Sequence, residues 1–214
     1  MCTHFTPITN RAAVRSRFGI EMPEDHPLET YPGMNAPLIV RSQRTGRVAC
    51  GLARFGLIPS WAKDEKIARH TYNARSETAH EKPSFRSAWR NRQFGLLMVD
   101  HFYEPSYASG KAVPWAIGLP SGEPFGIACL WDRWTHPATG EQVASFTMLT
   151  VNADKHPVMR QFHRAEDEKR TPVVLDESQC EEWLRADLAK ATLMMDSSRM
   201  PELAAKAAPS MRSS

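Results

Sequence analysis

A cysteine directly follows the initiator methionine of this chain, in the opening sequence MCTHFT. Loss of Met1, which is favoured when the next side chain is small, would leave Cys2 with a free α-amine and a thiol on neighbouring carbon atoms. No internal cysteine offers that pair of nucleophiles. Position alone favours an incidental or buried thiol, so a chemical role for Cys2 depends on the residues that accompany it.

The polar segment TYNARSET supplies the first candidate partners. Asn73, Arg75 and Glu77 lie there among few apolar residues, where a loop can present side chains to a ligand. The alternative is a local Asx turn with a surface ion pair, which taken alone is the more common arrangement. The segment therefore supports a site only in combination with other motifs.

Two further motifs carry groups that transfer protons or bind anions. Glu104 ends the apolar run VDHFYE, where its carboxylate can face a cleft and exchange protons or can lie in solvent. His163 and Arg164 precede a loop of mixed charge, and Arg170 stands just before a strand. Histidine suits proton transfer near neutral pH and arginine suits a phosphate, although a single histidine is more often structural.

Short β-rich runs and a few helices must position these residues. We expect strands at residues 2–5, in a hairpin over 38–59 that turns at Thr45 and Gly46, and at 93–104, 114–119, 124–134, 145–153 and 171–175. We expect helices at 9–19, capped by Thr9 or Asn10 and ended by Gly19, at 84–90, at 154–161 and at 176–188, capped by Asp176. These elements predict an α+β fold in a single domain, 1–214, whose tail frays from about residue 200.

The composition is that of an ordinary globular protein, with 214 residues, 42% hydrophobic and 24% charged, which excludes disorder as the main theme. The net charge of +3 is too small to indicate a nucleic acid by itself, although 19 of the 27 basic residues are arginines. Four widely spaced cysteines without a C-x-x-C pair argue against a zinc site. No signal-peptide or membrane-spanning pattern occurs, so we expect a cytoplasmic protein with reduced thiols.

Four motifs occur in a fixed order along the chain: M-C-x-x-F, N-A-R-S-E-T, F-Y-E and F-H-R-x-x-x-E-K-R-T-P-V-V-L. Together they resemble the SOS-response-associated peptidase (SRAP) family, whose members crosslink to abasic sites in single-stranded DNA. The resemblance extends from Cys2 to about Leu188, most of the chain. It implies a mainly antiparallel, twisted and barrel-like sheet with flanking helices.

The resemblance implies that Cys2 becomes the N-terminal residue and forms a thiazolidine with the ring-opened aldehyde of an abasic deoxyribose. Its amine would condense to an imine, and its thiol would add to the same carbon. Glu104 would exchange protons with the amine and the carbinolamine, and His163 would assist opening of the sugar ring. Asn73 would orient the Cys2 terminus or the sugar. No metal and no other cofactor is implied.

The resemblance also implies contacts with DNA. Arg75, Arg164 and Arg170 would bind phosphates next to the lesion. Trp61 stands where the family uses an aromatic wedge that stacks on an exposed base, and packing in the core is an equally good interpretation. The implied partner is single-stranded DNA with an abasic site, and the protein is expected to bind it as a monomer. We expect it in the cytoplasm, associated with the nucleoid where DNA is damaged, and we expect no membrane partner.

The chain departs from the usual pattern of the family in several places. His4 replaces a basic residue that contacts phosphate, so it would do so only when protonated. Pro32 lies in a loop, YPGMNAP, whose usual asparagine is lost or moved. Ala62 takes the place of a second tryptophan, and the insertion AEDEK separates His163 from Arg170. We expect these changes to affect the affinity for DNA rather than the chemistry.

Two other classes of protein also fit some of these residues. An N-terminal-nucleophile hydrolase or cysteine peptidase would expose Cys2 in the same way and pair it with His163. A non-catalytic module for single-stranded DNA would use Trp61 and the arginines, and Cys2 would be inert. A covalent product with abasic DNA distinguishes the crosslinking protein from both.

Overall fold

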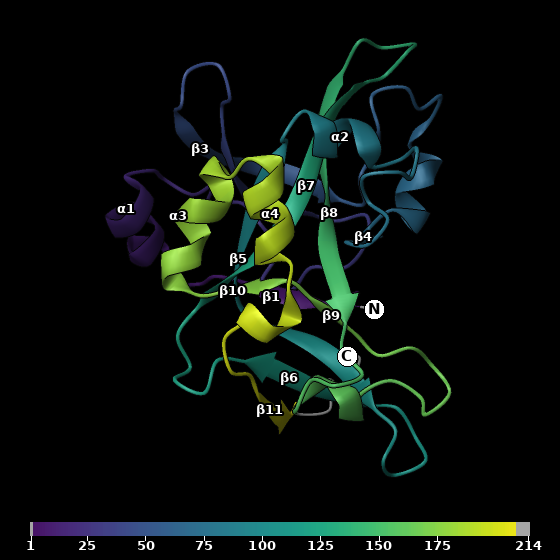
Figure 1. The fold of residues 1–214 in the computed structure, drawn as a ribbon. Helices are drawn as coiled ribbons and strands as arrows, with labels where there is room; N and C mark the ends of the chain where they lie inside the picture. Colours follow the sequence, from purple (N-terminus) through teal and green to yellow (C-terminus); the bar gives the residue numbers. More distant parts are fainter. Residues whose placement is uncertain (1, 209–214) are drawn as a thin grey trace.

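A sheet of eleven strands forms the centre of the computed structural model, which describes residues 2–208 (Figure 1). The strands are β1 (Phe5–Pro7), β2 (Asn35–Arg41), β3 (Val48–Phe55), β4 (Asn73–Arg75), β5 (Phe94–Ser106), β6 (Val113–Gly118), β7 (Phe125–Thr135), β8 (Gln142–Asn152), β9 (Arg170–Pro172), β10 (Val174–Leu175) and β11 (Ala204–Ala207). The helices are α1 (Arg11–Phe18), α2 (Arg86–Arg90), α3 (Glu177–Arg185) and α4 (Leu188–Met194), with 3₁₀-helices η1 (Glu65–His70), η2 (Met159–Gln161) and η3 (Ser197–Arg199).

Five of the strands close into a barrel. In the order β5, β7, β8, β3, β2 each strand pairs with the next, and β2 pairs with β5 again. Within this ring only the β3–β8 pairing is parallel. The α+β class and the mainly antiparallel, barrel-like sheet are therefore confirmed.

Alternating residues of the barrel strands face two different apolar cores, as the period of two along a strand requires. In β5, Leu97 and Val99 belong to a cluster that receives side chains from all five barrel strands, which is the barrel interior. Leu96 and Met98 belong instead to a cluster shared with α1 and α3 on the outside. In Figure 1, α1, α3 and α4 lie on one side of the barrel accordingly. Cys2 belongs to the interior cluster.

The helix ends follow the local signals in the sequence. Asn10 caps α1 by accepting a hydrogen bond from the N–H of Ala13, and Gly19 ends it in the left-handed conformation with φ 65°. Asp176 and Gln179 form a capping box at the start of α3. Both helices were expected within a few residues of these bounds.

Other elements differ from the sequence-based expectation. The first strand begins at Phe5 rather than at residue 2, and of the helix expected at 154–161 only the short η2 forms. The run 171–175 is divided between β9, which pairs with β8, and β10, which pairs with β7. The elements η1, β4 and α4 were not predicted from the sequence. No helix in the described part of the chain is long and apolar enough to cross a membrane.

The expected fraying of the tail is wrong for its first part. Residues Ala204–Ala207 form β11, which pairs antiparallel with β6, Ala204 opposite Gly118. The backbone hydrogen bonds of β6 supply the order that the alanine-rich sequence lacks. The rest of the expected frayed segment, 209–214, lies outside the described residues.

Candidate active site

Cys2 is fully buried, and both its backbone carbonyl and its thiol make hydrogen bonds. The side-chain Nδ2 of Asn73 donates a hydrogen bond to the Cys2 carbonyl oxygen at 2.7 Å. The Cys2 thiol donates to the carbonyl oxygen of His4 at 3.5 Å. A cysteine at a chain end is thus fixed in position instead of moving freely.

Strand pairing brings Glu104 next to Cys2. Phe5 of β1 lies opposite Phe102 of β5, and the pairing continues through a hydrogen bond of 2.9 Å from the N–H of Tyr103 to the carbonyl oxygen of His4. The chain that precedes β1 therefore runs beside the end of β5, where Glu104 is only 1% exposed. Burial raises the pKa of the Cys2 thiol far above its ordinary value, and the charge of Glu104 raises it further.

His163 reaches the same place from the segment after η2. Its Nε2 lies 3.3 Å from Oε2 of Glu104, and its backbone N–H donates to the carbonyl oxygen of Pro105 at 3.0 Å. The backbone of His163 has φ 64°, a conformation that costs a residue with a side chain about 1–2 kcal/mol. Such strain persists only where surrounding contacts impose it, and it is concentrated at functional sites.

Glu104 is buried and His163 is half-buried, and the two form a pair whose pKa values are both shifted. Burial raises the pKa of Glu104 to about 7 and lowers the pKa of His163 to about 4. Between these values the pair holds one proton, which resides on the carboxyl group. A carboxyl group with a pKa near 7 exchanges protons in both directions at neutral pH, as a general acid and base must.

Asn73 offers its side-chain Oδ1 in addition to the Nδ2 that binds Cys2. It is the first residue of β4, a three-residue strand that pairs parallel with β8, Asn73 opposite Met148. Within the described residues its Oδ1 is buried and has no hydrogen-bond partner. A buried acceptor without a donor is costly, so a donor from a ligand or a solvent molecule is expected there. Cys2, Asn73, Glu104 and His163, which we expected to act together, are gathered by four separate segments.

Arg75 and Arg170 are both bound to carboxylates. Arg170 is only 2% exposed and contacts Glu77 at 2.8 Å and Glu168 at 2.7 Å. Its guanidinium also donates to the carbonyl oxygen of Thr150 at 2.7 Å. The exposed Arg75 contacts the same Glu168, at 2.7 Å. The Glu168 carboxylate thus bridges two arginines in the way that a phosphate would.

His4 is enclosed by aromatic side chains. Its ring stacks on Tyr31 at 4.3 Å and on Tyr103 at 3.9 Å between centroids. Its Nε2 lies 3.2 Å from Oε2 of Glu29, and burial lowers the pKa of His4. Glu29 fills the side of the ring that a phosphate would need, so the expected phosphate contact requires displacement of this carboxylate.

Trp61 is 55% exposed, so its interpretation as a core residue is wrong. Its Nε1 donates to the carbonyl oxygen of Pro83 at 3.2 Å, which fixes the indole on the surface. The neighbouring Ala62 is buried in a small core, where its carbonyl oxygen accepts a hydrogen bond from Nε1 of Trp134 at 2.7 Å. A bulky side chain at Ala62 would not fit this core without repacking. Arg164 is exposed, with its guanidinium 5.5 Å from the ring of Tyr107.

A family model described as "SOS response associated peptidase (SRAP)" matches residues 1–209. The chain belongs to the SRAP family. It is 33% identical over 190 residues to the abasic site processing protein YoqW of Bacillus subtilis, covering 86% of this chain and 80% of that protein. It is 29% identical over 160 residues to the abasic site processing protein HMCES of Rattus norvegicus, covering 61% of this chain and 43% of that one.

The SRAP fold of this chain also occurs in solved structures. A crystal structure of a protein from Bordetella bronchiseptica superposes with a TM-score of 0.85 and 35% identity, covering 97% of this chain and all of the other. A protein from Bacteroides thetaiotaomicron superposes with a TM-score of 0.80 at 21% identity, which supports the fold alone.

Several residues around this SRAP site were not predicted from the sequence. Glu168 is the most informative, because it lies two residues before Arg170 and residues at that spacing in an extended chain face the same side. That spacing within the acidic insertion was a usable signal. The stacking of Tyr31 and Tyr103 on His4 left no local signal, because it joins three separate segments.

Proposed function

We propose that this SRAP protein processes abasic sites in single-stranded DNA by forming a thiazolidine crosslink through Cys2. The observation that carries the proposal is the convergence of Asn73, Glu104 and His163 on a buried Cys2. The relatives, which are named abasic site processing proteins, supply the substrate class.

The reaction begins when Met1 is removed and the deoxyribose opens. Cleavage of the Met1–Cys2 peptide bond by water frees the Cys2 amine, and it is the only proteolysis we propose. Ring opening moves a proton from the C1′ hydroxyl to the ring oxygen, which leaves an aldehyde at C1′. His163, neutral because burial lowers its pKa to about 4, assists this transfer together with Glu104.

The Cys2 amine then attacks the aldehyde carbon. The addition gives a carbinolamine, whose nitrogen loses a proton to the Glu104 carboxylate. Glu104, whose pKa of about 7 lets it hold that proton, returns it to the hydroxyl group, which leaves as water. The product is an imine between Cys2 and C1′. Asn73 holds the carbonyl of Cys2 throughout, so the amine keeps a fixed direction of attack.

The thiol of Cys2 completes the ring. Its sulfur bonds to the imine carbon, and its proton is transferred to the imine nitrogen, so the overall reaction joins protein and DNA with loss of one water. Because the thiol pKa is raised, the proton must be removed as the bond forms, and Glu104 is the neighbouring base. The thiazolidine leaves no aldehyde at C1′ to promote cleavage of the strand.

The same electrostatics disfavour a cysteine peptidase or hydrolase. Such enzymes need a thiolate stabilised by a neighbouring cation, which lowers the thiol pKa. Here burial and Glu104 raise the pKa of Cys2, and burial lowers that of His163. The Nε2 of His163 also contacts Glu104, which fits a role in proton exchange.

Binding of the strand would use groups at the edge of the site. Trp61 offers an exposed indole on which a base can stack. Phosphates next to the lesion would replace the Glu168 carboxylate between Arg75 and Arg170. Arg164 offers a further exposed guanidinium beside His163.

Incubation with abasic single-stranded DNA, followed by a denaturing gel, tests the proposal. We expect a shifted band that resists denaturant with the wild type and no such band with Cys2→Ala. Turnover of peptides or amides without a shifted band would favour the hydrolase. Equal binding of abasic and intact strands, unchanged in Cys2→Ala and without a covalent band, would favour the non-catalytic binding module.

A further inference from the structure

Five arginines line a cavity of about 500 Å³ away from Cys2. Arg41 ends β2, the turn between β2 and β3 contributes Arg44 and Arg47, the turn before β5 contributes Arg92, and β7 contributes Arg133. The β2–β3 turn and α2 lie in the upper part of Figure 1. We call this set of residues the arginine cavity.

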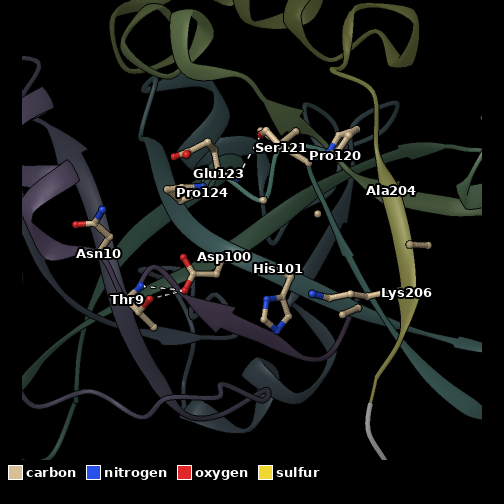
Figure 2. A pocket seen from close by; sticks show the side chains of 15 residues that line it. Thr9, Asn10, Asp100, His101, Pro120, Ser121, Glu123, Pro124, Ala204 and Lys206 are labelled. Carbon is tan, nitrogen blue, oxygen red and sulfur yellow. Dashed lines mark hydrogen bonds between the residues drawn. The ribbon is translucent and has the colours of Figure 1, made fainter.

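The arginine cavity has an excess of positive charge in its own lining, although Asp132 contacts Gln93 at its edge and Arg41 also lines a neighbouring cavity with Glu181. The lining of the arginine cavity contains no aspartate or glutamate, and the ion pairs within residues 2–208 involve other arginines, such as Arg75 and Arg170. A second cavity of about 580 Å³ differs in this respect, because Asp100 and Glu123 lie in it with Lys206 (Figure 2). Like charges held together without a counter-charge repel one another, so the arrangement is stabilised when an anion binds.

The lining is held in place by hydrogen bonds. The side chain of Gln43 donates to the carbonyl oxygen of Arg92 at 3.1 Å, which joins the β2–β3 turn to the turn before β5. Arg92 itself has φ 51°, a conformation that favours glycine, so its guanidinium is presented from a strained turn. Nε1 of Trp131, in the same lining, is buried and has no hydrogen-bond partner within the described residues.

One carboxylate connects the arginine cavity to the loop that carries Trp61. Oδ1 of Asp132 accepts from the side chain of Gln93 in the lining, at 3.3 Å. Its Oδ2 accepts from the N–H of Ser60 at 3.0 Å, one residue before Trp61. The cavity therefore adjoins the residue that we propose stacks on a base.

We infer that the arginine cavity binds the phosphodiester backbone of the DNA strand at a distance from the abasic site. Gln93 and Glu104 stand at opposite ends of β5, which corresponds to on the order of 30 Å along the strand. Planar guanidinium groups suit phosphate oxygens, and contacts to the backbone carry no sequence requirement, as an abasic-site protein needs. The inference rests on the proposed function for the identity of the anion as DNA.

A triple variant with Arg44→Gln, Arg92→Gly and Arg133→Gln tests the inference. The variant should fold, because these three side chains are exposed and glycine suits the backbone conformation at residue 92. The matched control removes three positive charges elsewhere, in Arg15→Gln, Lys190→Gln and Arg199→Gln. Fluorescence anisotropy would measure binding of an intact single strand of about 25 nucleotides over a series of salt concentrations. We expect the cavity variant to lose about tenfold in affinity at low salt, with a salt slope smaller by about two, since each lost phosphate contact removes roughly 0.7.

A short abasic oligonucleotide of about five nucleotides, too short to reach the cavity, separates this inference from the proposed function. The cavity variant should crosslink to it as fast as the wild type. If neither the wild type nor the cavity variant crosslinks to this oligonucleotide, the proposed function fails. The inference about the arginine cavity is then still decided by the anisotropy measurement. Equal affinity and salt slope in the cavity and control variants would overturn the inference.

Discussion

The cluster around Cys2 and the arginine cavity lie near opposite ends of β5 and differ in how their charges are balanced. Around Cys2 the carboxyl group of Glu104 is buried with its pKa raised to about 7, beside the half-buried and neutral His163. In the arginine cavity the five guanidinium groups have no carboxylate among the lining residues. The Cys2 cluster holds the reacting groups in place and shifts their pKa values. The arginine cavity leaves its positive charge available to bind an anion.

This difference corresponds to two separate tasks. Forming a bond requires a nucleophile held in one direction beside a group that exchanges protons near pH 7. Holding a long polyanion requires donors that are free to meet phosphates wherever the strand lies. Arg75 and Arg170 stand between the two cases, because Glu168 occupies the place where a phosphate would bind.

Removal of the Cys2 thiol is expected to have the largest effect. Cys2→Ser retains the amine and can form an imine, but its hydroxyl is a poor nucleophile, so the crosslinked band on a denaturing gel should be lost. Binding of intact strands should be unchanged, because Cys2 is not among the residues that line the arginine cavity. Cys50→Ser, which changes a half-buried thiol in β3, serves as the control and should crosslink normally. A normal yield with Cys2→Ser would remove the thiol from the mechanism.

Glu104→Gln should slow crosslinking by about 10²–10³-fold, because the amide cannot exchange protons. The pH profile sharpens this test. Glu104, with its pKa raised to about 7, is a base above that pH, so the wild-type rate should rise through pH 7. In Glu104→Gln the rate should rise with pH only through deprotonation of the α-amine, whose ordinary pKa is near 8. An unchanged profile would contradict the role of Glu104.

Loss of the exposed indole should weaken binding without affecting the chemistry. Trp61→Ala should reduce the affinity for single-stranded DNA by about tenfold, the value of one stacked base, while Trp61→Phe should retain most of it. The crosslinking rate at saturating DNA should stay the same. Anisotropy titrations measure the affinity, and equal affinities for Trp61→Ala and the wild type would exclude the wedge.

The smallest effect on DNA affinity is expected from a change of Glu168, whose carboxylate lies between Arg75 and Arg170. Glu168→Gln frees Arg75 and leaves Arg170 with Glu77, so we expect the affinity for single-stranded DNA to rise about threefold. Glu166→Gln makes the same charge change in the same loop and should have less effect. Equal gains in both variants would indicate a general charge effect instead of competition with phosphate.

The sequence predicts the main elements of the fold well where apolar runs are long. Strands β5, β7 and β8 are such runs, and the ends of α1 and α3 carry ordinary caps. Strand β11 could not be predicted, because the sequence AAKA has little strand preference and its order comes from pairing with β6. Strand β4 is three residues long and is likewise defined by its partner, β8.

The sequence predicts candidate residues for the site but not their geometry. The motifs indicate Cys2, Asn73, Glu104 and His163, yet the contact between Glu104 and His163 joins residues far apart in the chain. The burial that moves their pKa values depends on the whole barrel. Of the two carboxylates that enclose Arg170, expected to bind a phosphate, Glu168 is indicated by its spacing in the sequence, whereas Glu77 is brought there only by the fold.

The central claim is that Cys2, as an N-terminal residue, joins the abasic sugar through both its amine and its thiol. Intact-mass spectrometry of the purified protein, with and without an abasic oligonucleotide, tests it most directly. We predict a protein that lacks Met1 and an adduct whose mass equals protein plus oligonucleotide less one water. An adduct on chains that retain Met1, or one that forms after the amine has been blocked, would contradict the account.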